Sequence, residues 1–349
     1  MRQFLMGNEI LAKAAFDAGA KAMFAYPITP VTEIFANWAK LNKETDRIGL
    51  QTEDEMAAGF GVIGSVLAGK PAFTATGGPG MILMQDPLAM AEAMRLPMVI
   101  FDGQRGGPST GQVIYSQQEV NLSIFGGNGE GLRIVYSTSS LEDLYIYGKK
   151  VFETAWKYRF PTILLYDGYQ GKMKGEVDLP EGENGEVKSL EPILSGNIRN
   201  TYNLEEELGD TVLKIKEEFD KAASEIIEFE EYNYENADIY VCAHGIVSSA
   251  AKKAINQLKE EGINVGLFRP ITLSPFPKEK TKELISKNKR ILLFESSLGQ
   301  FYRLMISQAE IETKNIKTFF KPGVGFTPEE IFIAIKIELN KEDLKNGNH

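Results

Sequence analysis

The amino-acid sequence predicts an α/β protein built on mostly parallel sheets, and three observations carry this prediction. Short apolar runs alternate with helical patterns over roughly the first 170 residues, which is the order of βαβ units. Runs such as 98–101 are apolar throughout, as expected of strands in a sheet that helices cover on both faces. The same alternation starts again at Asp238, and 349 residues suffice for two domains.

Apolar runs and helical periodicity locate the elements of the first series. A strand over 21–26 stops at Pro27, because proline cannot donate a hydrogen bond to a sheet ladder. The other expected strands are 48–51, 72–76, 98–102, 133–136 and 162–166. The expected helices are 7–19, 32–41, 54–68, 81–94 and 141–158.

The alternation breaks between the two series. Residues 176–200 are rich in Gly, Pro, Glu and Asn, which indicates a linker or a surface excursion. Residues 204–235 are dense in Glu and carry apolar residues at helical spacing: Val212, Ile215, Phe219, Ala222 and Ile226. A solvated acidic helix with one apolar stripe is the simpler interpretation, and an acidic docking face for a partner is the alternative.

The second series completes the expected domain organisation. It continues with helices at 247–260, 279–286 and 300–311 and with strands at 265–268 and 291–295. We therefore expect a first domain over residues 1–175, an acidic linker with a helix over 176–235, and a second α/β domain over 236–349.

Charge and composition exclude several classes of function. The chain has 38 basic and 48 acidic residues, and this net charge of −10 disfavours a nucleic-acid or anionic-membrane surface. No apolar run approaches the ~18 residues of a membrane-spanning helix, and Met1–Met6 lack a signal-peptide pattern, so we expect a soluble, cytoplasmic protein. Cys242 is the only cysteine, and the histidines are His244 and His349. An internal disulfide and a self-contained iron–sulfur cluster are excluded, and no metal site is expected in this chain.

The stretch 26–30, Tyr-Pro-Ile-Thr-Pro, follows an expected strand and precedes an expected helix. Its two prolines stiffen the turn, because proline fixes its own φ and biases the preceding residue to extended geometry. Open α/β sheets bind ligands at the carboxyl ends of their strands, which is where this turn lies. With Thr29 or Thr32 as the helix cap, the Thr29 hydroxyl suits an anion at a helix N-terminus. A rigid strand-to-helix connection without a ligand is the alternative.

Glu55 opens a helix on which Ala58, Gly61 and Gly64 follow at three-residue steps. Small residues at that spacing form a smooth ridge that another helix can approach closely. The two acids before Glu55 fit the ordinary role of partners of the helix macrodipole. Glu55 is different because it lies in line with the small-residue face, and a carboxylate buried there needs a dedicated partner.

Two glycine-rich loops also follow expected strands. Residues 76–80, Thr-Gly-Gly-Pro-Gly, match neither the P-loop nor the dinucleotide pattern, so a tight turn fits better than a phosphate cradle. Residues 104–111 read Gln-Arg-Gly-Gly-Pro-Ser-Thr-Gly, and Arg105 there can clamp a carboxylate through two hydrogen bonds. A surface arginine without a role is the alternative. All these features lie at the carboxyl ends of strands, which favours one common site.

The order of these motifs resembles the α subunit of 2-oxoacid:ferredoxin oxidoreductases, in particular those acting on 2-oxoglutarate. The motifs are Gly-Asn-Glu at 7–9, Tyr-Pro-Ile-Thr-Pro at 26–30, Glu-x-x-Ala-x-x-Gly-x-x-Gly at 55–64, Thr-Gly-Gly-Pro-Gly at 76–80 and Arg-Gly-Gly-Pro-Ser-Thr-Gly at 105–111. Residues 269–277 and 295–300 resemble the second domain of that family. The resemblance runs from about residue 5 to residue 310 and is weakest over 175–235.

The resemblance implies a thiamine diphosphate enzyme. Its first domain would be the pyrimidine-binding domain of the thiamine-diphosphate fold, and its second a transketolase C-terminal-like domain. Glu55 matches the family's glutamate on the ring nitrogen of the aminopyrimidine. That contact favours the imino tautomer, whose neighbouring nitrogen takes the proton from thiazolium C2. Thr29 matches a residue near the substrate carboxylate, and Arg105 an arginine close to the thiazolium and the substrate.

The site residues that the resemblance implies fall into three groups. Catalysis is assigned to Glu55, Arg105 and Thr29, cofactor binding to Glu55, Pro27 and Ile28, and substrate binding to Thr29, Arg105, Ser109 and Thr110. Ser109 and Thr110 rest on the Pro-Ser-Thr-Gly sequence of the 2-oxoglutarate branch. The implied reaction is oxidative decarboxylation of a 2-oxoacid, with 2-oxoglutarate as first candidate, to the acyl-coenzyme A with reduction of ferredoxin.

Missing motifs imply partners. The sequence contains neither the Gly-Asp-Gly motif that holds the diphosphate in this family nor a set of cysteines for a cluster. The resemblance therefore implies a β subunit that carries the diphosphate site, Mg²⁺ and the iron–sulfur cluster, with γ and δ subunits as further candidates. The α chain alone would be inactive, and the helix face of Glu55 would be covered by the partner.

Other functions remain open at this point. The alternatives to 2-oxoglutarate are a branched-chain 2-oxoacid and pyruvate. The alternatives to an oxidoreductase are a subunit of a non-redox thiamine diphosphate enzyme and a catalytically silent scaffold. A cluster-binding cysteine motif in the partner would exclude the non-redox enzyme. We expect His244, at the end of a strand, to be structural, with a catalytic histidine as the alternative.

Overall fold

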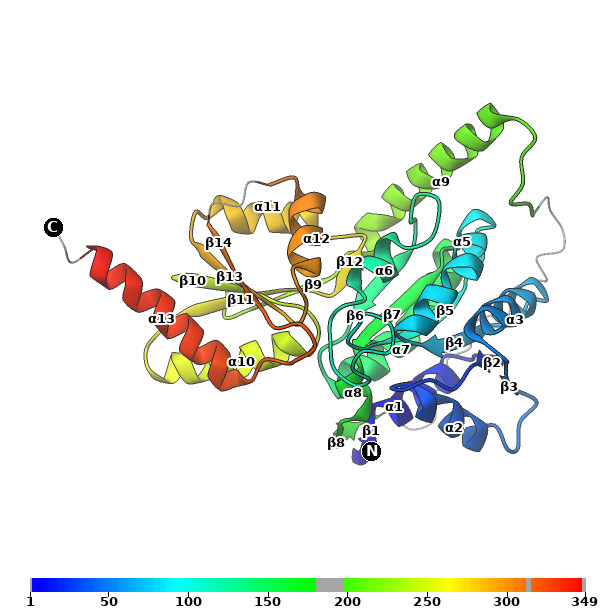
Figure 1. Ribbon diagram of the computed structural model, residues 1–349, viewed down its shortest axis with the longest axis horizontal. Coiled ribbons are helices and arrows are strands. Elements are labelled where there is room, and N and C mark those ends of the chain that lie inside the picture. The colour runs from blue at the N-terminus through cyan, green and yellow to red at the C-terminus, as the bar shows by residue number, and fades with distance from the viewer. Residues whose placement is uncertain (1, 180–197, 312–314, 347–349) are drawn as a thin grey trace.

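The computed structural model describes residues 2–179, 198–311 and 315–346, and two sheets with their helices lie side by side in it (Figure 1). The larger sheet has the order β12 (Thr272–Ser274), β6 (Ile134–Ser137), β7 (Thr162–Asp167), β5 (Val99–Gln104), β4 (Ala72–Thr76), β2 (Ala22–Ala25) and β3 (Ile48–Gln51). All neighbouring strands are parallel except β12 with β6. The predicted α/β class with mostly parallel sheets is confirmed.

Helices cover both faces of this sheet. α1 (Gly7–Asp17), α2 (Thr32–Leu41) and α7 (Leu141–Tyr158) pack together on one face. The other face carries α3 (Glu55–Leu67), α4 (Pro79–Leu83), α5 (Gln85–Ala93) and α6 (Val120–Phe125). Trp38 of α2 packs edge-on against Phe73 of β4, with ring centroids 5.1 Å apart, and Phe101 and Phe152 extend this buried aromatic cluster.

The smaller sheet has the order β14 (Ile316–Phe320), β13 (Arg290–Glu295), β10 (Ile239–Cys242), β11 (Val265–Pro270) and β9 (Phe229–Tyr232), of which only β9 is antiparallel to its neighbour. α10 (Gly245–Glu260) and α13 (Pro328–Asn346) pack together, as do α11 (Lys278–Ser286) and α12 (Gln300–Ala309). A two-stranded ribbon of β1 (Arg2–Met6) and β8 (Lys174–Asp178) lies beside the larger sheet, where α8 (Gly168–Lys172) follows β7.

The structure corrects some expected boundaries. The expected helix 81–94 is two helices, α4 and α5, because Pro87 lacks an N–H and its ring clashes with the carbonyl four residues back. The acidic helix does not extend to 235: 229–232 form β9, where Glu230 pairs with Arg269 and Glu231 with Lys280. Of the expected linker, residues 180–197 lie outside the described residues, as does His349.

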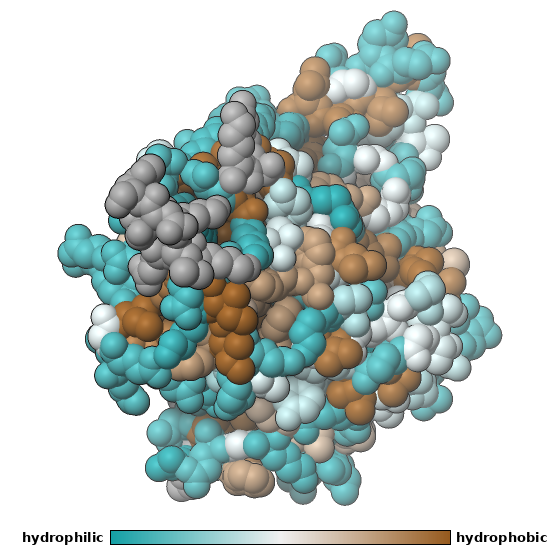
Figure 2. All heavy atoms as spheres, turned by 60° about the vertical axis from the view of Figure 1, so that its left-hand side comes forward, coloured by the Kyte–Doolittle hydropathy of each residue, from teal (hydrophilic) through white to brown (hydrophobic). Residues whose placement is uncertain are grey.

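The acidic helix itself is α9 (Glu205–Ile226), and its apolar stripe is confirmed where it meets the first domain. Phe219, Ala222 and Ile226 are buried, with the Phe219 ring 5.1 Å from that of Phe160. The outer part of α9 projects from the molecule in Figure 1, and Figure 2 shows hydrophobic residues exposed among hydrophilic ones on that projection. Within the described ranges, no helix has both the length and the apolar character that crossing a bilayer requires.

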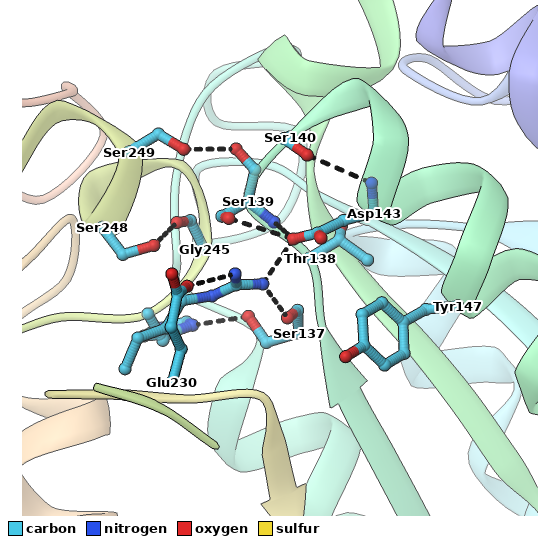
Figure 3. Close-up of polar contacts among 12 residues, drawn as sticks. Ser137, Thr138, Ser139, Ser140, Asp143, Tyr147, Glu230, Gly245, Ser248 and Ser249 are labelled. Atoms are coloured by element: carbon cyan, nitrogen blue, oxygen red, sulfur yellow. Dashed lines mark hydrogen bonds and ion pairs between the residues drawn. The ribbon is translucent and has the colours of Figure 1, made fainter. Parts of the chain in front are cut away.

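Polar side chains join the two halves of the molecule. The Arg269 guanidinium on β11 donates to the Ser137 carbonyl and pairs with Asp143 and Glu230. Figure 3 labels these three partners, which lie close together. His244 is fully buried, and its Nδ1 lies 3.0 Å from the Ser137 hydroxyl. Burial, helped by the charge of Arg269, lowers the pKa of His244 to about 3, so its ring is neutral. This buried, neutral ring fits the structural role expected of His244, which stays a prediction.

Asp167, at the end of β7, caps the first helix of the second domain. Its Oδ2 accepts a hydrogen bond of 2.7 Å from the Ile246 N–H in the first turn of α10. Burial raises the pKa of Asp167 to about 7, although the bonds from Ile246 and Gln117 oppose that shift. The folded protein therefore binds this proton more tightly than the unfolded chain does, which stabilises it at low pH. That contribution is lost as the pH rises from about 4 to about 7.

An Asp167→Asn variant is therefore expected to gain stability relative to the parent as the pH rises. Asparagine keeps an acceptor for the Ile246 N–H but does not ionise, so it avoids burying a charge at neutral pH. Between about pH 5 and about pH 8 its free energy of unfolding should rise relative to the parent's by on the order of 2 kcal/mol. Denaturant titrations at both pH values measure this difference. A variant whose free energy of unfolding, relative to the parent's, is lower at about pH 8 than at about pH 5 would contradict the prediction.

Candidate active site

The turn at 26–30 connects β2 to α2 at the carboxyl edge of the larger sheet. The buried Asn8 amide on α1 holds this turn, because its Nδ2 donates to the Pro30 carbonyl at 2.7 Å. α2 begins at Thr32 with Val31 as its N-cap and no side-chain cap, so the expectation that Thr29 or Thr32 caps this helix was wrong. The N3 N–H of α2, that of Ile34, to which a capping hydroxyl would bond, instead donates to the Val31 carbonyl at 2.9 Å.

Glu55 is the first residue of α3, and Asp54 caps this helix by accepting a hydrogen bond of 2.7 Å from the Ala57 N–H. The Glu55 side chain is 5% exposed, so it does not point into solvent. Burial is the largest cause that raises the pKa of Glu55; the charge of Asp54 adds to it, and the nearby Arg105 guanidinium opposes it. This carboxyl group is thus set to hold a proton more readily than an exposed glutamate.

The carboxyl group of Glu55 lies directly against the 76–80 turn. A Cβ added to Gly80 would lie 2.3 Å from Glu55 Oε1 and 2.2 Å from Thr76 Oγ1, so only glycine allows this approach. Thr76 Oγ1 is buried and makes no hydrogen bond to any of the residues that the structure describes. An acidic group with a raised pKa and an unpartnered hydroxyl therefore lie together at the end of β4.

Arg105 follows β5 and is 5% exposed. Its Nη1 donates to the Thr29 carbonyl at 2.7 Å and its Nη2 to the Thr110 carbonyl at 3.2 Å, while Nε is buried without a partner. The side chain lies across Gly78, where a Cβ would meet Nε at 2.6 Å. The structure thus brings Glu55, Arg105 and the backbone of Thr29 together, and the guanidinium keeps donors for one more ligand.

The remaining predicted residues lie at the rim of this site. Ser109 and Thr110 are exposed at the tip of the loop after Arg105, and only the Thr110 carbonyl reaches the guanidinium. Ser109 has a positive φ of 55°, and an antiparallel bridge between Gly106 and Gln112 closes the loop. Pro27 is exposed, and the half-buried Ile28 packs against the core.

A surface beside Glu55 is both apolar and open. Met56, Phe60, Ile82 and Leu83 on α3 and α4 are 37%, 38%, 57% and 42% exposed. A Cβ on Gly64 would meet no atom within 4 Å, so the small-residue ridge is open at that point, although Gly61 already packs on Phe24. We call Met56, Phe60, Gly64, Ile82 and Leu83 the α3–α4 face. Exposed apolar patches of this kind mark interaction surfaces.

Sequence reasoning missed two buried acids behind the site. Glu119, which is 4% exposed, accepts hydrogen bonds of 2.8 Å from the backbone N–H groups of Gly78 and Arg105, and its carboxyl group contacts that of Asp102. One signal was present: Asp102 is a lone acid in the otherwise apolar strand 98–102. Among the described residues there is no group of three His, Cys, Asp or Glu side chains that could hold a metal ion.

Comparison with known families identifies two matching regions. Residues 13–237 match the family described as pyruvate flavodoxin/ferredoxin oxidoreductase, thiamine diphosphate-binding. Residues 237–330 match pyruvate:ferredoxin oxidoreductase core domain II.

Two curated relatives are similar over most of their length. The chain is 33% identical over 306 residues to the ketoisovalerate oxidoreductase subunit VorB of Methanothermobacter thermautotrophicus, covering 85% of this chain and 87% of the relative. It is 32% identical over 331 residues to the 2-oxoglutarate synthase subunit KorA of Methanocaldococcus jannaschii, covering 86% and 90%.

Solved structures with the same fold include a 2-oxoglutarate:ferredoxin oxidoreductase and a transketolase. A 2-oxoglutarate:ferredoxin oxidoreductase from Magnetococcus marinus, with 2-oxoglutarate, coenzyme A and succinyl-CoA bound, superposes with a TM-score of 0.86 at 25% identity. The match covers 97% of this chain but 65% of that one. A split-gene transketolase superposes with a TM-score of 0.59 at 14% identity, over 96% and 98% of the two chains, which shows the fold alone.

Proposed function

The chain belongs to the pyruvate flavodoxin/ferredoxin oxidoreductase family, and we propose that it is the α subunit of a thiamine diphosphate-dependent 2-oxoacid:ferredoxin oxidoreductase. The observation that carries this proposal is the buried Glu55 carboxyl group, which lies against Gly80 and within the electrostatic reach of Arg105. The relatives named above, which are subunits of ketoisovalerate and 2-oxoglutarate oxidoreductases, support it.

The residues present fit half of a thiamine diphosphate site. The raised pKa of Glu55 suits a carboxyl group that shares a proton with a ring nitrogen of the aminopyrimidine, and the unpartnered Thr76 hydroxyl offers a second polar contact. When bound, this cofactor supplies the carbon nucleophile and the electron sink for decarboxylation. Pro27 and Ile28, in the turn next to the site, would contact its ring.

Arg105 and Thr29 would bind the 2-oxoacid. Because two guanidinium nitrogens already donate to the Thr29 and Thr110 carbonyls, the arginine is fixed before the substrate arrives, and its remaining N–H groups can bond to a carboxylate. The chain's net charge of −10 repels an anionic substrate, so this local cation must attract it. The Thr29 hydroxyl, on the same turn, would assist at the carboxylate.

The identity of the 2-oxoacid is part of the proposal. The Pro-Ser-Thr-Gly sequence at 108–111 favours 2-oxoglutarate, with Ser109 and Thr110 at the substrate, and a relative that carries 2-oxoglutarate in its name supports this choice. Ketoisovalerate is the second candidate, because a relative at 33% identity carries that name. Coenzyme A would be the acyl acceptor and ferredoxin the electron acceptor.

A partner subunit would complete the site. We propose that a β subunit covers the α3–α4 face and holds the diphosphate, Mg²⁺ and an iron–sulfur cluster. Apolar side chains exposed directly beside Glu55 support this place for the interface. Further γ and δ subunits would join the same complex.

The experiment that tests this proposal compares the chain alone with the reconstituted α–β complex. We expect 2-oxoacid-dependent reduction of ferredoxin or viologen from the complex only, with 2-oxoglutarate the best of a panel that includes ketoisovalerate and pyruvate. Phe60→Asp on the α3–α4 face should prevent assembly, because it places a charge in an apolar interface. The matched control is Leu213→Asp on α9, where the leucine is 70% exposed, and it should assemble normally. An inactive complex, or equal assembly of both variants, would contradict the proposal.

A further inference from the structure

Glu119 lies behind the site and bonds to both of the loops that form it. Its Oε2 accepts from the Gly78 N–H and its Oε1 from the Arg105 N–H, each at 2.8 Å. Gly78 belongs to the turn against which Glu55 lies, and Arg105 is the proposed substrate ligand. One buried carboxylate thus fixes the distance between the two halves of the site.

Asp102 is the partner of Glu119, and the two buried acids must share a proton. Burial and the charge of Glu119 raise the pKa of Asp102 well above its usual range. Burial raises the pKa of Glu119 too, but the Asp102 carboxyl and the two backbone N–H groups oppose that shift. Asp102 Oδ2 accepts a bond of 2.7 Å from the Ser123 hydroxyl, while its buried Oδ1 receives none. These opposing effects favour the proton on Asp102 over Glu119, and a protonated Asp102 would be the donor where the two carboxyl groups meet.

The Arg105 side chain depends on these bonds through its backbone. Its guanidinium crosses Gly78, which has a φ of +59° and leaves no room for a Cβ against the arginine Nε. A shift of either loop would move the guanidinium relative to the Glu55 carboxyl. Misplacement by about 1 Å can cost an enzyme on the order of a hundredfold in rate, so the two loops need a bond that fixes their relative position.

The second domain holds the segment that carries Glu119. The Gln117 N–H donates to the Ser296 carbonyl at 3.0 Å, and the Ser296 N–H donates back to Gln117 Oε1 at 3.0 Å. Gln300 of α12 donates to the Gln118 carbonyl at 2.8 Å and accepts from the Asn121 N–H at 3.0 Å. Residues on both sides of Glu119 are therefore bonded to the second domain, which gives that domain a direct connection to the site.

We propose that Glu119 is the positioning residue of this site: its carboxyl group, with Asp102 beside it and the second domain as support, sets the Gly78 turn against Arg105. This inference rests on the proposed function of Glu55 and Arg105. Glu119 would act through the two loops to which it bonds and not by contact with substrate or cofactor. It gives core domain II a part in the reaction, which is to hold segment 116–121 in place.

Two conservative variants of the assembled complex test this arrangement. In Glu119→Gln only one side-chain oxygen remains, so one of the two backbone N–H bonds is lost and an amide N–H faces a donor. We expect kcat/KM for the 2-oxoacid to fall about ten- to a hundredfold. In Asp102→Asn the amide nitrogen can still donate to Glu119, and its oxygen can still accept from Ser123, so we expect kcat/KM to stay within a few fold of the parent.

Two further measurements report on the hydrogen bonds of Glu119 and on the proton of Asp102. Hydrogen exchange of the Gly78 and Arg105 amides should be faster in Glu119→Gln and unchanged in Asp102→Asn. The infrared band of a protonated carboxyl group at neutral pH should be present in the parent and weaker in Asp102→Asn. The control is Glu92→Gln, another buried carboxylate, which accepts from the Leu132 N–H at 2.7 Å and pairs with Arg133 rather than with either loop of the site. This control should lower the melting temperature without changing kcat/KM or the hydrogen exchange of the Gly78 and Arg105 amides.

The outcomes separate this inference from the function on which it rests. If Glu119→Gln keeps parental kinetics and amide exchange while Arg105→Ala is inactive, the positioning role is wrong and the proposed function stands. A silent Glu119→Gln with an inactive Asp102→Asn would overturn the assignment of the proton. Full activity of both Glu55→Ala and Arg105→Ala would overturn the proposed function and this inference with it.

Discussion

Replacing Glu55 with alanine in the reconstituted complex should lower 2-oxoacid-dependent ferredoxin reduction by about a hundred- to ten-thousandfold, the usual contribution of a group that transfers a proton in catalysis. The loss should appear in kcat, because in the proposed function this carboxyl group would share a proton with the cofactor's pyrimidine ring and so activate the bound cofactor. Glu55→Gln should be almost as impaired, since its amide fills the same space beside Gly80 but cannot share a proton.

Glu53→Ala is the matched control for this prediction. Glu53 lies two residues before Glu55 and is exposed, so its loss should leave both kcat and assembly unchanged. Parental turnover in Glu55→Ala would remove the carboxyl group from the reaction. An equal loss in both variants would indicate a general effect of charge near the start of α3.

Arg105→Ala should cost on the order of a hundred- to a thousandfold in kcat/KM, comparable to the loss of one oxyanion donor. The variant loses the cation for the substrate carboxylate, and it also frees the Thr29 and Thr110 carbonyls. Arg105→Lys should recover only part of this activity, because an ammonium group cannot serve two carbonyls and a carboxylate in the planar geometry of a guanidinium. The KM for the 2-oxoacid should rise in both variants.

A matched control for Arg105 lies outside the site. Arg95 also donates to two backbone carbonyls, those of Arg159 at 2.8 Å and Tyr158 at 2.7 Å. Arg95→Ala should lower the melting temperature with little change in KM. A change in Arg105→Ala that was confined to protein yield, with parental kinetics in the protein recovered, would refute the substrate role of Arg105.

Local patterns predicted much of the fold, because they reflect periodicity within single elements. The expected ranges 32–41, 48–51, 72–76 and 141–158 coincide with α2, β3, β4 and α7. β9 and β12 were not predicted, because neither is set by its own sequence. The acidic residues of β9 are typical of an exposed helix, and they lie in a strand because Glu230 pairs with Arg269 and Glu231 with Lys280. β12 joins a sheet whose other strands lie more than a hundred residues earlier in the chain.

The candidate site was predictable where the chemistry lies in a continuous motif. Thr29 and Arg105 lie in turns that follow strands, Glu55 opens the helix after β3, and parallel strands bring such segments to one edge of the sheet. Glu119 was not predictable, and Asp102 gave only the signal of a lone acid in an apolar strand, since the importance of both comes from contacts across 41, 14 and 17 positions in the chain. Ser109 shows the opposite case: its motif suggests a ligand, yet the side chain is exposed at a loop tip.

The central claim is that the Glu55 carboxyl group contacts the pyrimidine ring of a thiamine cofactor shared between this chain and a partner. An experimental structure of the α–β complex with thiamine diphosphate bound tests it most directly. Our account predicts a Glu55 oxygen at hydrogen-bonding distance, about 2.7–3.2 Å, from a ring nitrogen, with partner residues on the diphosphate. A cofactor bound elsewhere, with Glu55 touching none of its atoms, would contradict it.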